Sequence, residues 1–314
     1  MGNKLIVTAA PHITGPDTTQ KIMQRVCIAL LPTLIASILI FGINSLILTV
    51  ITVAACMFFE WGYCKLVGRE VPVGDFSAAV TGVLLAFNLP ATLPWWMAIV
   101  GAVIAIVIVK QLFGGLGYNV ANPAIVARIA LAMGFASRMA NYPHPANGID
   151  ALASATPLAV SGQMGAADYV TLLLGNHGGV LGETCAITLL LGGIYLIATK
   201  VISPVIPVTY LATVAVLSAV SGHDPIVQLL SGGLMLGAFF MATDYVTSPT
   251  TNKGKLVFGI GLGIITCAIR FLGTMNEGVS FAILLMNLLV PYIEILTRQD
   301  RLGIAKAKKE GAAK

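Results

Sequence analysis

The sequence has few charged residues for its length. Only 10% of its 314 residues are Lys, Arg, Asp or Glu, whereas 57% are apolar and the mean hydropathy is +0.90. A soluble domain carries about 25% charged residues to cover its surface, so a water-soluble globule, a coiled coil and a disordered chain are excluded. The apolar character runs from end to end, which also excludes an enzyme with a single membrane anchor. The composition indicates a polytopic membrane protein.

Paired cysteines, metal-ligand spacings and a signal peptide are also missing. The five cysteines are scattered singly, which is typical of buried apolar residues rather than of a zinc site or a disulfide framework. The four histidines show no metal-ligand spacing, so no metal site is predicted. The first twenty residues are polar and contain no apolar core before a small-residue cleavage site, so we expect no cleavable signal peptide. The net positive charge of +5 comes largely from the C-terminal tail and does not indicate a nucleic-acid partner.

The apolar segments have the length of membrane-spanning helices. Strands of a transmembrane barrel need about 9–11 residues of alternating polarity, whereas a spanning helix needs about 20 apolar residues. Ten spans are predicted, at residues 22–43, 46–67, 77–89, 95–109, 120–136, 183–199, 204–220, 226–243, 256–272 and 278–296. The predicted fold is therefore all-α, with about ten transmembrane helices.

Two of these spans end at breaks, and the two halves of the chain resemble each other. The third span stops at Asn88 and the eighth at Asp244. Broken helices are tolerated in a membrane only where they line a protein cavity. Residues 82–90 resemble residues 237–245 in pattern and place. Because five spans is an odd number, this similarity predicts two inverted five-helix repeats with broken helices; chance similarity between Gly-rich apolar segments is the alternative.

Basic residues lie on one side of the predicted spans. They are Lys4, Lys21 and Arg25 near the N-terminus, Lys65, Arg69, Lys110, Lys200, Lys253 and Lys255 in loops, and Arg298, Arg301, Lys306, Lys308, Lys309 and Lys314 in the tail. The alternate loops have none of their own, apart from Arg138 and Arg270 at helix ends. The positive-inside rule therefore places both termini in the cytoplasm. Glu60, near the cytoplasmic end of its span, is expected to be interfacial, and an ion ligand is the alternative.

The chain is thus predicted to have five parts. They are a cytoplasmic N-terminal segment (1–21), a first five-helix repeat (22–138), an extracytoplasmic loop (139–182), a second five-helix repeat (183–297) and a basic cytoplasmic tail (298–314).

The extracytoplasmic loop contains the pattern D-x-x-x-S-A-T-P-L, from Asp150 to Leu158. No His or Cys flanks Thr156 at the spacing of a nucleophilic site. Taken alone, these residues fit an ordinary capped turn, with Asp150 or Ser154 as the cap. The small residues Ser154 and Ala155 directly precede Thr156 in this pattern.

Three polar residues are predicted to meet inside the membrane. Asn119 and Asn122 lie three apart, so they share a face if a helix begins there, and Asp244 occupies the matching break of the other half. Asn side chains in a membrane are costly unless they bond something. That partner is either a ligand or a neighbouring helix. The Gly-rich stretch 114–117 is no dinucleotide fingerprint, because such a fingerprint requires a preceding strand and a βαβ unit.

The Asp150–Leu158 pattern and three further stretches resemble the RnfD/NqrB family of membrane redox subunits. The stretches are residues 114–124, 240–251 and 277–287, and the resemblance covers essentially the whole chain. In length, and in the absence of a long N-terminal extension, the chain is more similar to the RnfD branch than to the NqrB branch. One departure is Ala153, where the family's motif often has a hydroxyl residue.

The resemblance implies a component of an Rnf-type ferredoxin:NAD⁺ oxidoreductase in a prokaryotic cell membrane. Such a complex couples electron transfer to Na⁺ or H⁺ translocation, and the implied partners are RnfA, RnfB, RnfC, RnfE and RnfG. In this family a flavin transferase joins the phosphate of FMN to the threonine hydroxyl, here that of Thr156. Asp150 would bind the transferase's metal or cap the turn. A small-solute channel or transporter is the alternative function, because an inverted repeat suits that class too.

The resemblance also implies a second, noncovalent flavin, riboflavin. Its ring edge would bind Asn119 and Asn122, and Asp244 would reach the same cavity. Arg128 is the one basic residue well inside a predicted span. It would neutralise a reduced flavin, pair with an acid or extend to the membrane interface.

Overall fold

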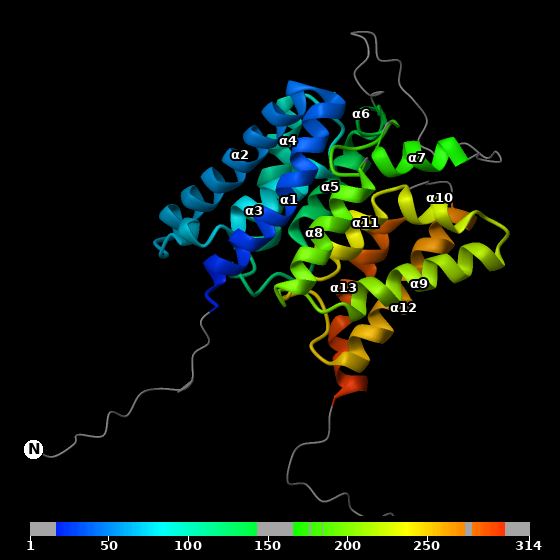
Figure 1. The fold of residues 1–314 in the computed structure, drawn as a ribbon. Coiled ribbons are helices and arrows are strands. Elements are labelled where there is room, and N and C mark those ends of the chain that lie inside the picture. The colour runs from blue at the N-terminus through cyan, green and yellow to red at the C-terminus, as the bar shows by residue number, and fades with distance from the viewer. Residues whose placement is uncertain (1–16, 143–165, 176, 184, 274–277, 299–314) are drawn as a thin grey trace, which may run out of the picture.

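The computed structural model describes residues 17–142, 166–175, 177–183, 185–273 and 278–298 (Figure 1). Within these residues the regular elements are helices, without a strand, which confirms the predicted all-α class. The first half contains α1 (Thr19–Phe41), α2 (Ile43–Val67), η1 (Pro72–Asp75), α3 (Ser77–Phe87), α4 (Trp95–Val103), η2 (Ile104–Gln111), α5 (Pro123–Gly134) and α6 (Ala136–Met139). The second half contains α7 (Ala166–Leu174), α8 (Ala186–Ala198), α9 (Val205–Val220), α10 (Pro225–Leu230), α11 (Leu234–Leu236), η4 (Gly237–Met241), α12 (Asn252–Leu272) and α13 (Val279–Thr297).

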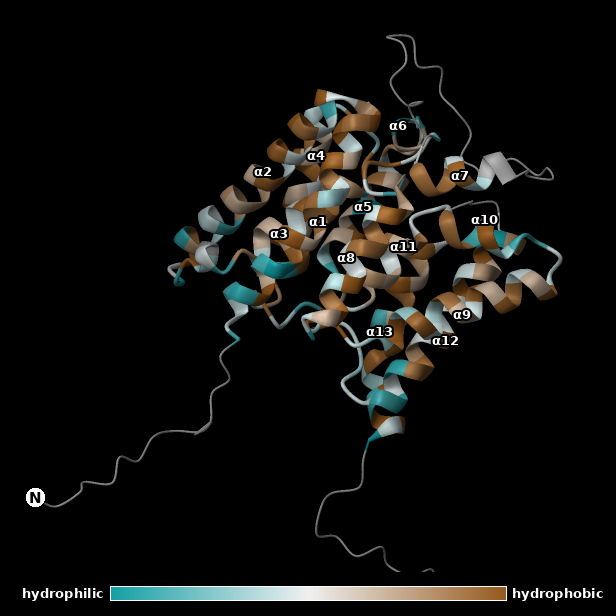
Figure 2. Cartoon of the chain, in the orientation of Figure 1, coloured by the Kyte–Doolittle hydropathy of each residue, from teal (hydrophilic) through white to brown (hydrophobic). Residues whose placement is uncertain are grey.

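Four of the described helices, α1, α2, α12 and α13, are long and apolar enough to cross a membrane. Shorter apolar helices accompany them: α3, α4 with η2, α5, α8 and α9. Figure 2 shows that apolar residues predominate along the helices. Many large apolar side chains are exposed, among them Leu39, Leu66 and Leu296, at 80%, 89% and 85%. Such a surface is favourable against lipid and unfavourable in water. The chain is a multi-pass membrane protein.

Local sequence explains where several helices begin. The Asn122 side chain accepts hydrogen bonds at the start of α5, with Pro123 in the first turn. Thr251 caps α12 in the same way, by accepting from the main-chain nitrogen of Gly254. Asn and Thr side chains accept hydrogen bonds from the free N–H groups of a first helical turn. Proline is favoured in that turn because its missing N–H would have no partner there. The predicted span at 120–136 therefore starts as a helix three residues later than the apolar pattern indicates.

The predicted eighth span, 226–243, is not one helix. It is divided into α10, α11 and the π-helical η4. Gly232 and Gly233 follow α10 with φ values of 73° and 64°, a left-handed conformation that glycine adopts without steric cost. The apolar pattern predicted the break only at Asp244, because it does not register backbone conformation.

The two halves of the chain meet along two helix pairs. α1 packs along α8, and α5 packs against α13 (Figure 1). Within the halves, α2 packs against α3 and α9 against α12. Glycines allow close approach at these interfaces: a Cβ on Gly82 of α3 would lie 2.7 Å from Cα of Val53 in α2, and one on Gly192 of α8 would overlap the carbonyl of Ala29 in α1.

Candidate functional site

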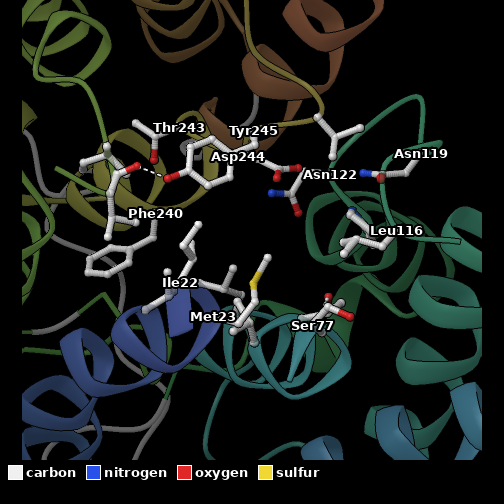
Figure 3. Close-up of a pocket in the computed structure, with 18 of the residues that line it drawn as sticks. Ile22, Met23, Ser77, Leu116, Asn119, Asn122, Phe240, Thr243, Asp244 and Tyr245 are labelled. Atoms are coloured by element: carbon white, nitrogen blue, oxygen red, sulfur yellow. Dashed lines mark hydrogen bonds between the residues drawn. The ribbon is translucent and has the colours of Figure 1, made fainter. Parts of the chain in front are cut away.

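A partly open cavity lies where the helix breaks of both halves meet (Figure 3). Its apolar walls come from α1, α3 and η4, and include Met23, Leu84 and Phe240. Its polar lining consists of Ser77, Thr81, Lys110, Asn119, Asn122, Thr243, Asp244 and Tyr245. The structure therefore brings together the three polar residues that the sequence placed in one site, Asn119, Asn122 and Asp244.

Two π-helical segments lead to this cavity. η2 is followed by a hydrogen bond from N of Leu112 to O of Val107 (3.0 Å), and η4 by one from N of Ala242 to O of Gly237 (2.7 Å). Such a five-residue spacing replaces the α-helical spacing of four, and π-helical turns are frequent at functional sites. Lys110 lies in the first segment, and Asp244 follows the second. Both halves thus use the same local distortion to bring a charged residue to the cavity.

The Asn122 side chain joins the start of α5 to the end of η4 at the cavity. Its Oδ1 accepts hydrogen bonds from N of Ala124 (3.1 Å) and N of Ile125 (3.4 Å), and its Nδ2 donates to O of Met241 (3.3 Å). Asn119 is bonded locally, through Nδ2 to O of Ala121 (3.2 Å). A side-chain amide has two N–H donors, so one such bond from each Nδ2 leaves a donor for a ligand.

Asn287 supports this arrangement from α13. In the amide orientation that satisfies its hydrogen bonds, its oxygen accepts from N of Asn122 (3.1 Å) and its nitrogen donates to O of Thr247 (3.0 Å). Thr247 in turn donates from Oγ1 to Oδ2 of Asp244 (3.1 Å). Figure 3 shows Asn122 and Asp244 on one side of the cavity, opposite Met23 and Ser77. Asn287 and Thr247 therefore hold the side of the cavity that carries Asn122 and Asp244.

A buried ion pair adjoins the cavity, and the sequence did not predict it. Nζ of Lys110 lies 2.7 Å from Oε1 of Glu60, and the two side chains are 3% and 0% exposed. Nε2 of Gln111 donates to the same Oε1 (2.9 Å), and Lys110 also donates to Oγ of Ser77 (2.7 Å). The prediction that Glu60 is interfacial was wrong, and Lys110 does not lie in a solvated loop. Each charge is stabilised by the other in a place where either alone would be costly.

Arg128 lies outside the cavity lining. Its side chain is buried, at 5% exposure, and NH1 donates to Oδ1 of Asn88 (3.1 Å) and to Oγ of Ser280 (2.7 Å). It thereby joins α5 to the end of α3 and the start of α13. Of the roles predicted for it, extension to the membrane interface is excluded by this burial.

The predicted modification site falls outside the described residues. This applies to Asp150, Ser154, Ala155 and Thr156, since residues 143–165 are not described. The segment after it, residues 177–183, is buried, and N of Gly182 donates to O of Phe87 at the end of α3 (2.8 Å).

These features define a multi-pass helical membrane protein whose broken helices enclose a polar cavity. The chain belongs to the NQR2, RnfD, RnfE family, whose profile matches residues 6–303, and the predicted resemblance is thereby confirmed.

Similar proteins match over nearly their whole length, and each is named as the D component of its complex. The chain is 46% identical to that of the Na(+)-translocating ferredoxin:NAD(+) oxidoreductase complex of Acetobacterium woodii, over 98% of both chains. It is 37% identical to that of the proton-translocating ferredoxin:NAD(+) oxidoreductase complex of Clostridium ljungdahlii, over 96% of this chain and 97% of that one. It is 39% identical to that of the ion-translocating oxidoreductase complex of Stutzerimonas stutzeri, over 95% and 96%.

Proposed function

We propose that this chain is the membrane-embedded D component of an ion-translocating ferredoxin:NAD⁺ oxidoreductase complex. The observation that carries the proposal is the 46% identity to such a component over 98% of both chains. The chain works as one part of a redox-driven translocase, together with its partners RnfA, RnfB, RnfC, RnfE and RnfG. The full-length match favours this function over a small-solute channel or transporter.

The first proposed cofactor is FMN, attached covalently to Thr156 by a flavin transferase. The pattern from Asp150 to Leu158 supports this attachment, because it presents a hydroxyl among the small residues Ser154 and Ala155. In this step the Thr156 oxygen takes the FMN phosphoryl group from a flavin adenine dinucleotide donor: the pyrophosphate P–O bond breaks, AMP leaves with the hydroxyl proton, and a phosphoester remains. A covalent link also accounts for cofactor retention by a loop without basic residues, since residues 139–182 contain no Lys or Arg.

The second proposed cofactor is a noncovalent flavin, riboflavin, in the cavity of Figure 3. Support comes from the remaining amide donors of Asn119 and Asn122, which match the carbonyl oxygens and ring nitrogens of a flavin edge. The apolar side chains of Phe240 and Leu84 suit the faces of a flat ring. When bound, the flavin accepts and passes on electrons; the chain binds it, orients it and shields it from bulk water.

We further propose that the chain consists of two five-helix repeats inserted in opposite senses. The pairing of α1 with α8 and of α5 with α13 supports this arrangement, because a two-fold axis brings equivalent elements together.

The orientation follows from the basic residues. Both termini face the cytoplasm and the Thr156 loop faces outward, because Lys and Arg gather on the side of the termini. This places Thr156 within reach of an extracytoplasmic transferase in a prokaryotic cell membrane.

Inverted membrane vesicles that contain the complex test the function. With reduced ferredoxin and NAD⁺, they should form NADH and accumulate Na⁺ or H⁺, and vesicles lacking this chain should do neither. A re-expressed chain should restore both. Solute flux that continues without an electron donor would instead indicate the channel or transporter.

A further inference from the structure

Lys110 presents a positive charge to the cavity. Its side chain lines the cavity together with Ser77, whereas its ion-pair partner Glu60 does not line it. The ion pair is therefore oriented, with the ammonium towards the cavity and the carboxylate behind it on α2. A charge in this position acts through a weakly polarisable environment, where its effect is much larger than in water.

The ammonium of Lys110 has an unused donor. A lysine ammonium carries three N–H groups. Two of them are directed to Oε1 of Glu60 and Oγ of Ser77, each at 2.7 Å. Ser77 accepts that bond because its own hydroxyl donates to Oδ1 of Asp75 (2.6 Å). Among the described residues, no acceptor is bonded to the third N–H, although the side chain is only 3% exposed.

Asp244 lines the same cavity with an acidic side chain. A ligand in the cavity therefore meets an ammonium on the η2 side and a carboxyl group on the η4 side. The amides of Asn119 and Asn122 are neutral, so they do not distinguish between ligands of different charge. The charge preference of the cavity depends on Lys110 and Asp244.

We propose that Lys110 binds the noncovalent flavin of this cavity and stabilises its reduced form relative to its oxidised form. This inference rests on the proposed function, because it assumes a flavin in the cavity. Reduction by two electrons from the ferredoxin–NAD⁺ chain and one proton from water leaves one negative charge on the flavin ring. The third N–H of Lys110 donates to the ring, and its positive charge is most favourable once that negative charge is present.

The proposal is tested with purified complex carrying Lys110→Met. The midpoint potential of the extractable flavin is measured by spectroelectrochemical titration, and the flavin is then extracted with mild acid and quantified. We expect the reduced flavin to bind at least about tenfold more weakly relative to the oxidised flavin, which lowers the potential by about 30 mV for a two-electron couple. Lys110→Arg keeps the positive charge, so its flavin should have a midpoint potential close to that of the unmodified complex.

A double variant separates flavin binding from neutralisation of Glu60. Lys110→Met alone leaves the buried Glu60 carboxylate without its ion-pair partner. In Glu60→Gln/Lys110→Met that carboxylate is gone, so the complex should assemble even if the single variant does not. The same lowered potential is expected there. An unchanged potential in the assembled double variant, with flavin retained, would overturn the inference while leaving the cavity flavin intact. An unmodified complex without any extractable flavin would contradict the proposed cavity cofactor itself.

Discussion

The side-chain amide of Asn122 donates a hydrogen bond to the main-chain oxygen of Met241 (3.3 Å), across 119 residues of sequence. The bond joins the first residue before α5 to the last residue of η4. The helix breaks of the two halves are therefore fastened to each other at the cavity. A change at either break is expected to alter the shape of the whole site.

Asn122→Ala should empty the cavity of its proposed flavin. The substitution removes the cap of α5, at a cost of about 0.5–2 kcal/mol, and the bond to Met241. Flavin extracted by mild acid should fall well below that of the unmodified complex, while covalent FMN is retained. Asn122→Asp keeps the capping oxygen but lacks the Nδ2 donor, so it should keep α5 capped and still lose extractable flavin. Unchanged extractable flavin in Asn122→Ala and in Asp244→Asn alike would place the second flavin elsewhere.

Arg270→Met should destabilise the break between α10 and α11. The Arg270 guanidinium donates to the main-chain oxygens of Gln228 (2.6 Å), Ser231 (2.9 Å) and Gly232 (3.3 Å). Buried carbonyls left without a donor cost about 1–3 kcal/mol each. The thermal unfolding midpoint of Arg270→Met in detergent should be clearly lower than that of the unmodified protein. Arg270→Lys should have an intermediate midpoint, because lysine keeps the charge but lacks the planar guanidinium. A midpoint equal to that of the unmodified protein would refute this role.

The sequence predicted the apolar helices and the meeting of Asn119, Asn122 and Asp244, because periodicity and composition report burial in lipid. It did not predict the Glu60–Lys110 pair. That contact depends on the π-helical turn of η2, and the residues it joins are 50 positions apart along the chain. Such a turn has no distinctive composition, since it is formed by tertiary packing.

Arg270 illustrates the same limit. Its place at a helix end was visible in the sequence, but its partners lie in a break 38 to 42 residues earlier. The signal that could have revealed the break is the Gly232–Gly233 pair, which the hydropathy pattern does not weigh.

Gly82→Ala should weaken the packing of α3 on α2. The added Cβ would lie 2.7 Å from Cα of Val53. This neighbour is a main-chain atom, so it cannot move aside as the end of a flexible side chain could. Overpacking of this kind costs about 1–3 kcal/mol. Gly62→Ala is the matched control, because a Cβ at Gly62 has nothing within 4 Å and alanine favours a helix. A thermal unfolding midpoint lowered equally by both substitutions would contradict the packing account.

Cysteine labelling tests the proposed orientation. In a background without the native cysteines, Gly148→Cys should react with an impermeant maleimide in whole cells, because its loop faces outward. Lys306→Cys should react only after the cells are opened. The reverse pattern would overturn the orientation and, with it, the access of an extracytoplasmic transferase to Thr156.

The covalent flavin is the most direct test of the central claim that this chain is a flavin-carrying redox protein. The chain is co-expressed with a flavin transferase, denatured, separated on a gel and illuminated with ultraviolet light, and the peptide of residues 150–158 is then weighed by mass spectrometry. We predict a fluorescent band and a peptide mass increased by FMN less one water. Thr156→Val, which lacks only the hydroxyl, should give neither signal. A non-fluorescent chain with unmodified Thr156, recovered from a complex that still couples ferredoxin oxidation to ion transport, would contradict the account.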